Sequence, residues 1–598
     1  MRHYNNGRKR PDNNKKELET KPSAVPILKL TTLGFRALTR RGKKVLVLYG
    51  VGLSFLSLLD AAALGILAKS FLAVSENSET RVTFEAQPLI FVVVLFLVRS
   101  ILSTAISYVG LREFAKEETI LGQAAFHRFI NAAWTDVRLW KQSKLIMDVD
   151  RAPNGLVQGF LLLVVTILSE VASAFVIFAM LLILQPITAI STIIFFISVA
   201  ILQHKWLSKA SSRAGKAIVD HVNFTYDLLN DAFAVSKILR IMPSNSLENV
   251  LKDSRSALSL ARAKSNFFAM LPRYFMESIL AIGFVVVAAA TYYISGSAQV
   301  FPAITVFAAA GFRLLPIINR IQGLILALFS AHPLASEALR SQIELGSDLP
   351  IDGTRQIQNR LEDNAMLSLS DVCFKFPDSN KNVLQGINLQ FQRGKQYAIV
   401  GPSGSGKTTL LDLIIGLIEP SSGTVQRNSQ VIGYVPQDTH LTSGTISENV
   451  ALEWNSATID ESNVSRSVTS ARLEEIVDRV EADSQLTKIG NVSLNMSGGQ
   501  KQRIGLARAL YRNPTLLALD EATSALDTET EHQVMQTVSH LRGNMTTIII
   551  AHRLSTVQHA DQVIYLEDGI VRGIGTFTEL RKSVPNFARQ VEIGILKE

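Results

Sequence analysis

The chain has 598 residues, more than a single hydrophobic core usually holds, so at least two structural units are expected. Its 47% hydrophobic and 19% charged residues place it on the apolar side of soluble composition. The only cysteine, Cys373, excludes an intrachain disulfide and a cysteine metal cluster, and we interpret it as a small apolar strand residue.

The first 44 residues form a basic arm with 13 Lys or Arg against 3 Asp or Glu. The apolar stretch that follows is too long for the core of a signal peptide, so no cleavage is expected. Because the arm has few apolar residues to bury, we expect it to be disordered or to lie against a membrane surface.

Six apolar segments follow the arm, and several exceed the ~20 residues that a helix needs to cross a bilayer. They are Val45–Val74, Pro88–Leu111, Leu156–Leu184, Ile187–Leu202, Tyr274–Ile294 and Phe301–Phe329. The alternative is a set of buried helices in a large soluble protein. We predict a transmembrane domain of six helices over residues 45–330, followed by a polar linker over residues 331–364.

The basic residues are distributed unevenly between the segments. The arm and the two long connections, Arg112–Gly155 and His204–Arg273, hold 13, 7 and 11 Lys or Arg, whereas the short connections hold only Arg81. The positive-inside rule then predicts a cytoplasmic N-terminus in a multi-pass protein of the cytoplasmic (inner) membrane. Since the net charge of +9 is explained by these loops, no nucleic-acid partner is expected.

Short β-rich runs alternate with helical segments over residues 365–598, which indicates an α/β domain. A glycine-rich loop directly follows the apolar run Ala398–Val400 and precedes a predicted helix. Its backbone N–H groups would surround phosphates, Lys407 would reach the β and γ phosphates, and the Thr408 hydroxyl would ligate Mg²⁺. The candidate ATP-binding residues of this loop are Gly401, Ser403, Gly404, Ser405, Gly406, Lys407, Thr408 and Thr409.

Two carboxylates end a second apolar run, Leu516–Leu519. Asp520 suits Mg²⁺ coordination and Glu521 suits activation of the attacking water. Two adjacent acids could also be no more than a polar strand end, but the phosphate loop supplies the site that such carboxylates need.

The segment Met496-Ser-Gly-Gly-Gln500 and the helical run after it resemble the signature motif of ABC ATPases. The resemblance implies that Phe376 stacks on adenine, Gln437 senses Mg²⁺ and water, and His552 contacts the γ-phosphate. It also implies that Ser524–Asp527 communicates across a dimer. The signature residues Ser497, Gly498, Gly499 and Gln500 would contact the ATP held by a partner subunit.

This resemblance extends to the exporter-type half-transporters, in which six spans precede the ATPase domain. The implied fold is an α-helical six-span transmembrane domain followed by an α/β P-loop ABC ATPase domain, with ATP and Mg²⁺ as cofactors. Because the chain has one phosphate loop and one signature, a second half-transporter is required, and an identical chain is the expected partner. The chain departs from the pattern at Met496, Phe376 and Asn491, and the last leaves domain coupling open.

Four arginines in or near the spans, Arg99, Arg273, Arg313 and Arg320, are candidate ligands for an anionic substrate. The alternative is that they pair with Asp60, Glu170 or Glu277 inside the bundle. The segments Leu271–Glu277 and Phe312–Arg320 resemble those of bacterial lipid-linked oligosaccharide flippases, which implies an amphipathic, pyrophosphate-bearing lipid substrate. A peptide or drug exporter of the same fold, and an ATP-gated channel or regulatory membrane ATPase, are the other hypotheses.

Overall fold

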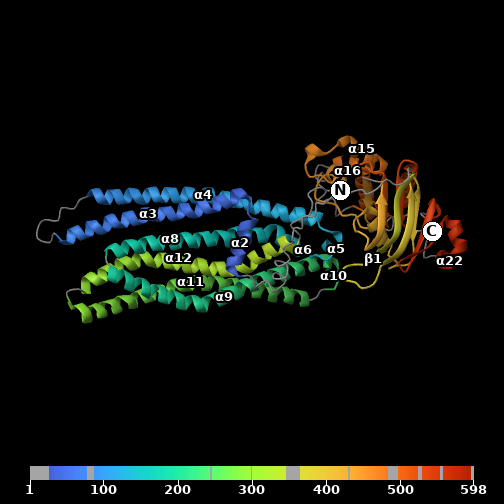
Figure 1. Ribbon diagram of the computed structural model, residues 1–598. Coiled ribbons are helices and arrows are strands. Elements are labelled where there is room, and N and C mark those ends of the chain that lie inside the picture. The colour runs from blue at the N-terminus through green and yellow to red at the C-terminus, as the bar shows by residue number, and fades with distance from the viewer. Residues whose placement is uncertain are drawn as a thin grey trace, which may run out of the picture. The chain divides into compact units, whose positions relative to one another are not determined.

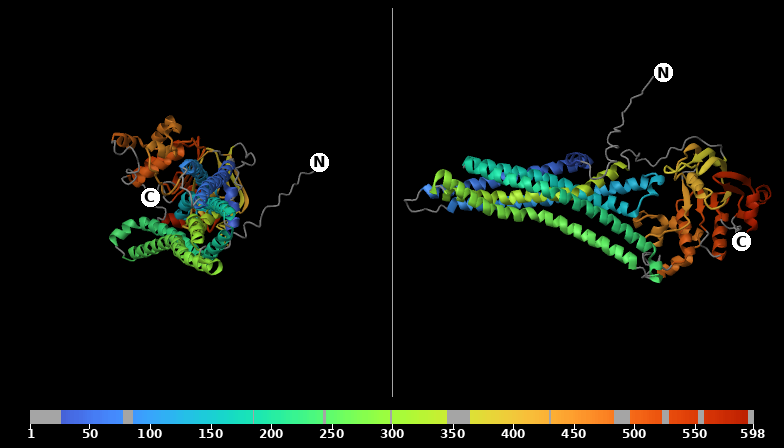
Figure 2. Two further views of the ribbon diagram at one scale, coloured as in Figure 1. Left: turned by 90° about the vertical axis from the view of Figure 1, so that its left-hand side faces the viewer. Right: turned by 90° about the horizontal axis from the view of Figure 1, so that it is seen from below.

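The computed structural model describes residues 26–76, 86–184, 186–242, 245–297, 300–344, 364–428, 431–482, 496–522, 528–551 and 557–593. These residues form two compact units, one within Met1–Ala132 and Leu139–Leu349 and the other within Ala133–Arg138 and Pro350–Glu598. Figures 1 and 2 show a helical first unit and a second unit built around β-sheet.

The first unit is helical throughout its described residues. Its long helices are α3 (Arg40–Glu76), α4 (Ala86–Asn131), α8 (Leu162–Leu184), α9 (Pro186–Ala234), α11 (Asn245–Ser295) and α12 (Val300–Glu344). Shorter segments are α2 (Ile27–Ala37), α6 (Gln142–Ile146), α7 (Ala152–Leu156), α10 (Ser236–Ile241) and two π-helical turns, Met147–Arg151 and Val157–Leu161. Figure 1 shows the long helices lying side by side, with α3 against α4 and α8, and α12 against α9 and α11.

Five of the six predicted spans fall within one of these long helices, whereas the third, Leu156–Leu184, begins in α7 and the second π-helical turn and continues through α8. Among the described residues, five helices are long and apolar enough to cross a membrane. The fourth predicted span lies in α9, where many side chains are outside the described residues, so the count of six stays a prediction. The two long connections consist in part of extensions of the spanning helices, because α4, α9 and α11 all run well beyond their apolar segments, and short helices lie between these extensions.

Two boundaries differ from the sequence prediction. Part of the basic arm is folded, since the amphipathic helix α2 buries Leu30 and Gly34 against the bundle. The predicted linker is helical at its start, because α12 continues to Glu344 and buries Ala335 and Leu339. In both places a few apolar residues at helical spacing allow a helix to pack on the bundle, although the surrounding residues are polar.

The outer surface of the bundle is apolar. Leu97, Ile101, Phe175 and Val285 are between 59% and 70% exposed, and each lies within a predicted span. Exposed apolar faces of this extent are unfavourable in water and are typical of helices that contact lipid.

The second unit contains two sheets. A three-stranded antiparallel sheet has the order β2-β1-β4, formed by β1 (Ala365–Phe374), β2 (Leu384–Gln392) and β4 (Ser422–Arg427). A six-stranded sheet has the order β5-β6-β7-β3-β8-β9, formed by β3 (Gln396–Val400), β5 (Ile432–Val435), β6 (Leu516–Asp520), β7 (Thr546–Ile550), β8 (Gln562–Glu567) and β9 (Ile570–Gly575). Its first five strands are parallel, so their carboxyl ends lie along one edge.

Helices cover this sheet. They are α13 (Lys407–Ile415), α14 (Ile446–Ala451), α15 (Glu461–Ser470), α16 (Glu474–Ala482), α18 (Gly498–Leu510), α19 (Thr528–His540), α21 (Phe577–Ser583) and α22 (Pro585–Glu592), while α5 (Trp134–Val137) also groups with this unit. Tyr397 and Ile399 of β3 face the three-stranded sheet and α13, whereas Ala398 and Val400 face the opposite helices. Because alternate side chains of β3 pack into two different apolar clusters, the strand is buried on both faces and the sheet lies between two apolar layers.

Candidate functional site

The glycine-rich loop lies where the sequence places it, between β3 and α13. Strand β3 is central in the six-stranded sheet, with β7 on one side and β8 on the other, and β6 is the neighbour of β7. The loop after β3 and the carboxylates at the end of β6 therefore lie at the same edge. An α/β sheet of this kind binds ligands at the carboxyl ends of its strands.

Two glycines of the loop, Gly404 and Gly406, have left-handed backbone conformations that favour glycine. Gly406 has φ +99°, and a Cβ there would lie 2.9 Å from Leu384 Cδ2. Gly404 has φ +79°, and a Cβ there would meet no atom within 4 Å, so the space beside its Cα is empty. The left-handed conformations turn successive N–H groups toward one concave surface, which is the geometry that binds phosphate.

The Lys407 side chain lies across this loop and is buried, at 6% exposure. Its Nζ donates to the carbonyl oxygens of Gly401 and Pro402, both at 3.0 Å. Burial lowers the pKa of Lys407, while the carboxylates of Glu521 and Asp520 act to raise it. The buried Ser405 hydroxyl has no hydrogen-bond partner within the described part of the chain. A cationic ammonium group, an unpaired hydroxyl and an open glycine backbone together fit the phosphates of a nucleotide.

The two predicted carboxylates follow the buried strand β6, and their environments differ. Asp520 is 7% exposed and accepts a long hydrogen bond of 3.5 Å from the Tyr434 hydroxyl. Glu521 has φ +49°, which is strained for a residue other than glycine, and its side chain is half-buried. Gln437 Nε2 donates to Glu521 Oε2 at 2.8 Å, so the amide and the carboxylate predicted to handle water are in direct contact.

Sequence analysis missed one titratable group of this site, Asp412 on α13. Burial, together with the charge of Asp520, raises the pKa of Asp412 from 3.8 to about 6. Burial also raises the pKa of Tyr434 well above its usual range, with Asp520 contributing. An acidic residue within the apolar run Leu410–Ile415 was the available sequence signal, because such a residue is costly to bury as a charged group.

Phe376 lies just after β1, and its ring meets that of Phe374 edge-on at 4.9 Å. Phe374 and Leu384 are paired between β1 and β2, and Leu384 in turn lies against Gly406. Phe376 thus lies beside the strand pair that borders the glycine-rich loop. Within that loop, Ser403 and Thr408 are exposed and Thr409 is half-buried.

The signature segment caps a helix. The Ser497 hydroxyl accepts from Gln500 N, and Gln500 Oε1 accepts from Ser497 N at 3.0 Å, which is a reciprocal capping box at the start of α18. Gly498 and Gly499 form the first helical positions, so their N–H groups point out of the helix start, where an anion is favoured. His552, Ser524–Asp527 and Asn491 lie outside the described residues.

The candidate substrate arginines are each engaged by a carboxylate, apart from Arg313, whose side chain is not described. Arg99 pairs with Asp60 at 2.9 Å, Arg320 with Glu170 at 2.7 Å, and Arg273 with Glu277 at 2.9 Å. These are the partners that the alternative interpretation named. The Arg320–Glu170 pair joins α12 to α8, whereas Arg273 and Glu277 are one turn apart on α11.

A bundle of long apolar helices, followed by a mixed-sheet domain with this loop and these carboxylates, has the fold of an exporter-type ABC half-transporter. Residues 384–524 match the family model described as "ABC transporter". A solved structure titled "Structure of a bacterial Atm1-family ABC exporter with ATP bound" superposes with a TM-score of 0.72 at 20% identity, covering 93% of this chain and 99% of that chain. At that identity the likeness establishes the fold.

Curated relatives match this chain over somewhat less than two fifths of its length. The "ATP-dependent lipid A-core flippase" of Ralstonia nicotianae is 39% identical over 244 residues, covering 39% of this chain and 40% of the relative. The "Putative multidrug export ATP-binding/permease protein YgaD" of Bacillus subtilis is 38% identical over 228 residues, covering 36% of this chain and 38% of the relative. The match spans about two fifths of each relative's length.

Proposed function

We propose that this chain is one half of an ATP-hydrolysing exporter or flippase that moves an amphipathic, anionic substrate across the cytoplasmic membrane. The observation that carries the proposal is the contact between Gln437 and Glu521 at the carboxyl end of β6, beside the Lys407 loop. A phosphate loop alone would fit a nucleotide sensor. A carboxylate held by an amide donor next to that loop adds a group that can take a proton from an attacking water.

In this proposal each group has one role. The loop N–H groups and Lys407 hold the β and γ phosphates, Phe376 stacks on the adenine, and Glu521 accepts a proton from water. Thr408, Asp520 and Gln437 would hold Mg²⁺, which when bound neutralises charge on the terminal phosphates. His552 would contact the γ-phosphate on the same edge.

The catalytic assembly is proposed to need a second, identical chain. The capped start of α18, with Ser497, Gly498, Gly499 and Gln500, would face the ATP held on the partner's loop. The exposure of Gln437 and the half-exposure of Glu521 support this proposal. In a single chain these two groups are open to bulk solvent, and a second chain would cover them and exclude water from the site. ATP binding would close the pair, and hydrolysis would reopen it and drive alternating access.

The substrate proposal rests on intramembrane arginines and on the relatives named lipid A-core flippases. Arg320 is the strongest candidate, because its side chain is 57% exposed although it is paired with Glu170. An arginine in this state can exchange its carboxylate partner for a phosphate oxygen or bind both, since its planar group offers several donors. Arg99, Arg273 and Arg313 would contribute further donors.

ATP turnover of the full chain in lipid vesicles tests the proposal. Wild type and Glu521→Gln are compared with and without a polyprenyl-pyrophosphate-linked glycan. We expect the lipid to stimulate turnover in wild type only. An absence of ATP turnover in wild type would overturn the exporter proposal, whereas turnover without stimulation would overturn the anionic-lipid substrate alone.

A matched set of variants separates a substrate role of Arg320 from a structural one. Arg320→Gln alone leaves Glu170, which is 14% exposed, as an unpaired carboxylate, and this is costly. The double variant Arg320→Gln, Glu170→Gln removes both charges. If Arg320 binds the substrate, the double variant stays defective in flipping while its unstimulated ATP turnover persists. Restored flipping in the double variant would mean that Arg320 serves only to pair with Glu170.

Export of a hydrophobic drug is the second candidate, favoured by the multidrug name of the Bacillus subtilis relative. It predicts stimulation of ATP turnover by neutral amphipathic compounds and no requirement for Arg320. The same vesicle assay distinguishes the two substrates.

A further inference from the structure

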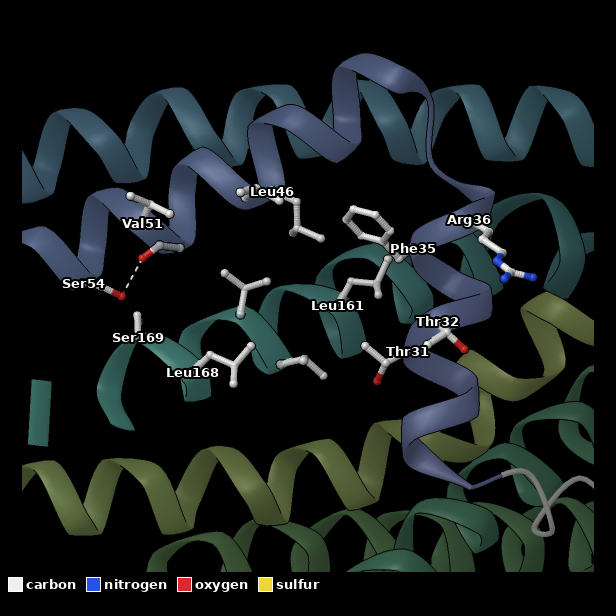
Figure 3. Close-up of a pocket in the computed structure, with 14 residues that line it drawn as sticks. Thr31, Thr32, Phe35, Arg36, Leu46, Val51, Ser54, Leu161, Leu168 and Ser169 are labelled. Carbon is white, nitrogen blue, oxygen red and sulfur yellow. Dashed lines mark hydrogen bonds between the residues drawn. The ribbon is translucent and has the colours of Figure 1, made fainter. Parts of the chain in front are cut away.

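A pocket of about 660 Å³ lies in the first unit between α2, α3 and α8. Figure 3 shows α2 at one end of the pocket, with α3 and α8 forming its two long walls. Its volume is within the range of roughly 300–1,000 Å³ that is typical of small-molecule sites. The proposed transport cycle uses none of the residues that line it.

The walls of the pocket are apolar, although four hydroxyl groups line it. Thr31 and Thr32 donate to carbonyl oxygens of their own helix, both at 2.8 Å. Ser54 and Ser169 also donate within their own helices, at 2.8 and 2.9 Å. Because each hydroxyl is already used, the surface offered to a ligand is mainly hydrocarbon from Leu, Val and Phe side chains.

One end of the pocket carries positive charge. Arg36 lies there, as Figure 3 shows, and its side chain is exposed. Among the described residues no carboxylate pairs with Arg36. Lys43 Nζ donates to the Arg36 carbonyl oxygen at 3.0 Å, which brings a second cation to the same end. The pocket is thus amphipathic, with an apolar length and a cationic mouth.

The length of the pocket matches a hydrocarbon chain within one leaflet. It extends along α3 from Leu46 to Ser54 and, on the other wall, from Leu161, the residue before α8, to Ser169 of α8. Each stretch rises by about 12 Å, which is most of the roughly 15 Å of hydrocarbon in one leaflet. Both helices begin near α2, so the apolar walls lead away from the cationic mouth, as the acyl chain of a lipid leads away from its head group.

We propose that this pocket binds one acyl chain of an anionic glycerophospholipid, with the phosphate of the lipid at Arg36. The charge at the mouth favours an anionic over a zwitterionic head group, because Arg forms strong hydrogen bonds with phosphate oxygens. The lipid would contact α2, α3 and α8 at once, and so would hold the amphipathic helix α2 on the bundle. This is a resident lipid site, distinct from the proposed transport path.

Native mass spectrometry of the full-length protein tests the proposal. The purified protein is incubated with dioleoylphosphatidylglycerol or dioleoylphosphatidylcholine, and the retained lipid is counted. We expect about a fivefold preference for phosphatidylglycerol in wild type, the factor expected from one basic group at a membrane surface, and a markedly smaller preference in Arg36→Gln, in which only Lys43 remains at the mouth. Lys44→Gln, which removes an exposed cation that does not line the pocket, should keep the preference.

A second pair of variants tests the acyl-chain part. Val51 lines the pocket and Leu48 does not, yet both are exposed apolar residues of α3, at 60% and 68%. Val51→Trp should lower retention of both lipids severalfold, whereas Leu48→Trp should match wild type. Equal retention in Val51→Trp and wild type, or an equal loss of preference in Arg36→Gln and Lys44→Gln, would overturn the proposal. ATP turnover of each variant checks that it is folded.

Discussion

Asp412 is expected to make the second unit less stable as the pH rises. Its pKa is about 6 in the folded protein and 3.8 in its ordinary state, so the folded form holds the proton more tightly. A raised carboxyl pKa does not lower the free energy of unfolding below pH ~4. The destabilisation grows between about pH 4 and pH 6 and is constant at higher pH. The substitution Asp412→Asn removes the titration and should therefore stabilise the protein at neutral and basic pH.

The magnitude follows from the two pKa values. Their difference of about 2 units corresponds to about 3 kcal/mol at pH 8, and about half of this is already present at pH 5. The gain from Asp412→Asn should therefore increase by about 1.5 kcal/mol between pH 5 and pH 8. For a domain of this size, that is about 3–6 °C in unfolding temperature. These are upper values, because Asp412 is only partly buried, so solvent screens part of the effect, and because the asparagine amide must itself be buried.

The assay is thermal unfolding of the full-length protein in detergent, without nucleotide, at several pH values. The transition of the second unit is the one that ATP shifts upward. Asp378→Asn, which neutralises an exposed acid of the same unit, is the control and should show no pH-dependent gain. If Asp412→Asn gives the same change at pH 5 and pH 8, the burial of this carboxyl does not act as described.

Three further substitutions probe the site and the bundle. Glu521→Gln should lower ATP turnover about 10²–10⁴-fold, the usual contribution of a general base, with ATP binding retained in a filter assay; an unchanged rate would show that another group takes the proton. Gly406→Ala, which places a Cβ 2.9 Å from Leu384 at φ +99°, should weaken ATP binding at least tenfold and lower the unfolding temperature, while normal affinity would mean that the loop adapts. Gly215→Leu should destabilise the bundle by several degrees, because even a Cβ would collide with the Ser330 carbonyl oxygen where α9 and α12 meet; a wild-type unfolding temperature would refute that close contact.

The sequence by itself determined the order of the two units and the position of the glycine-rich loop. Apolar runs longer than a bilayer is thick have few alternatives to a spanning helix, and five of the six predicted spans lie within single long helices. The glycine-rich loop and the strands ending at Val400 and Asp520 were predicted correctly, because short buried runs next to phosphate-binding residues are local patterns. The fold class inferred from the signature segment is confirmed by the family model and the structural match.

Tertiary structure decided the contacts that join distant segments. From the sequence, Arg320 could either bind the substrate or pair with a carboxylate such as Glu170. Only the packing of α12 on α8 brought the two side chains to 2.7 Å. The pKa of Asp412 is raised because the folded domain buries its carboxyl and because the charge of Asp520, far along the chain, acts on it. Helix α2 folds because Leu156 and Leu161 receive its buried face. These effects depend on burial and distance between elements, which no local pattern encodes.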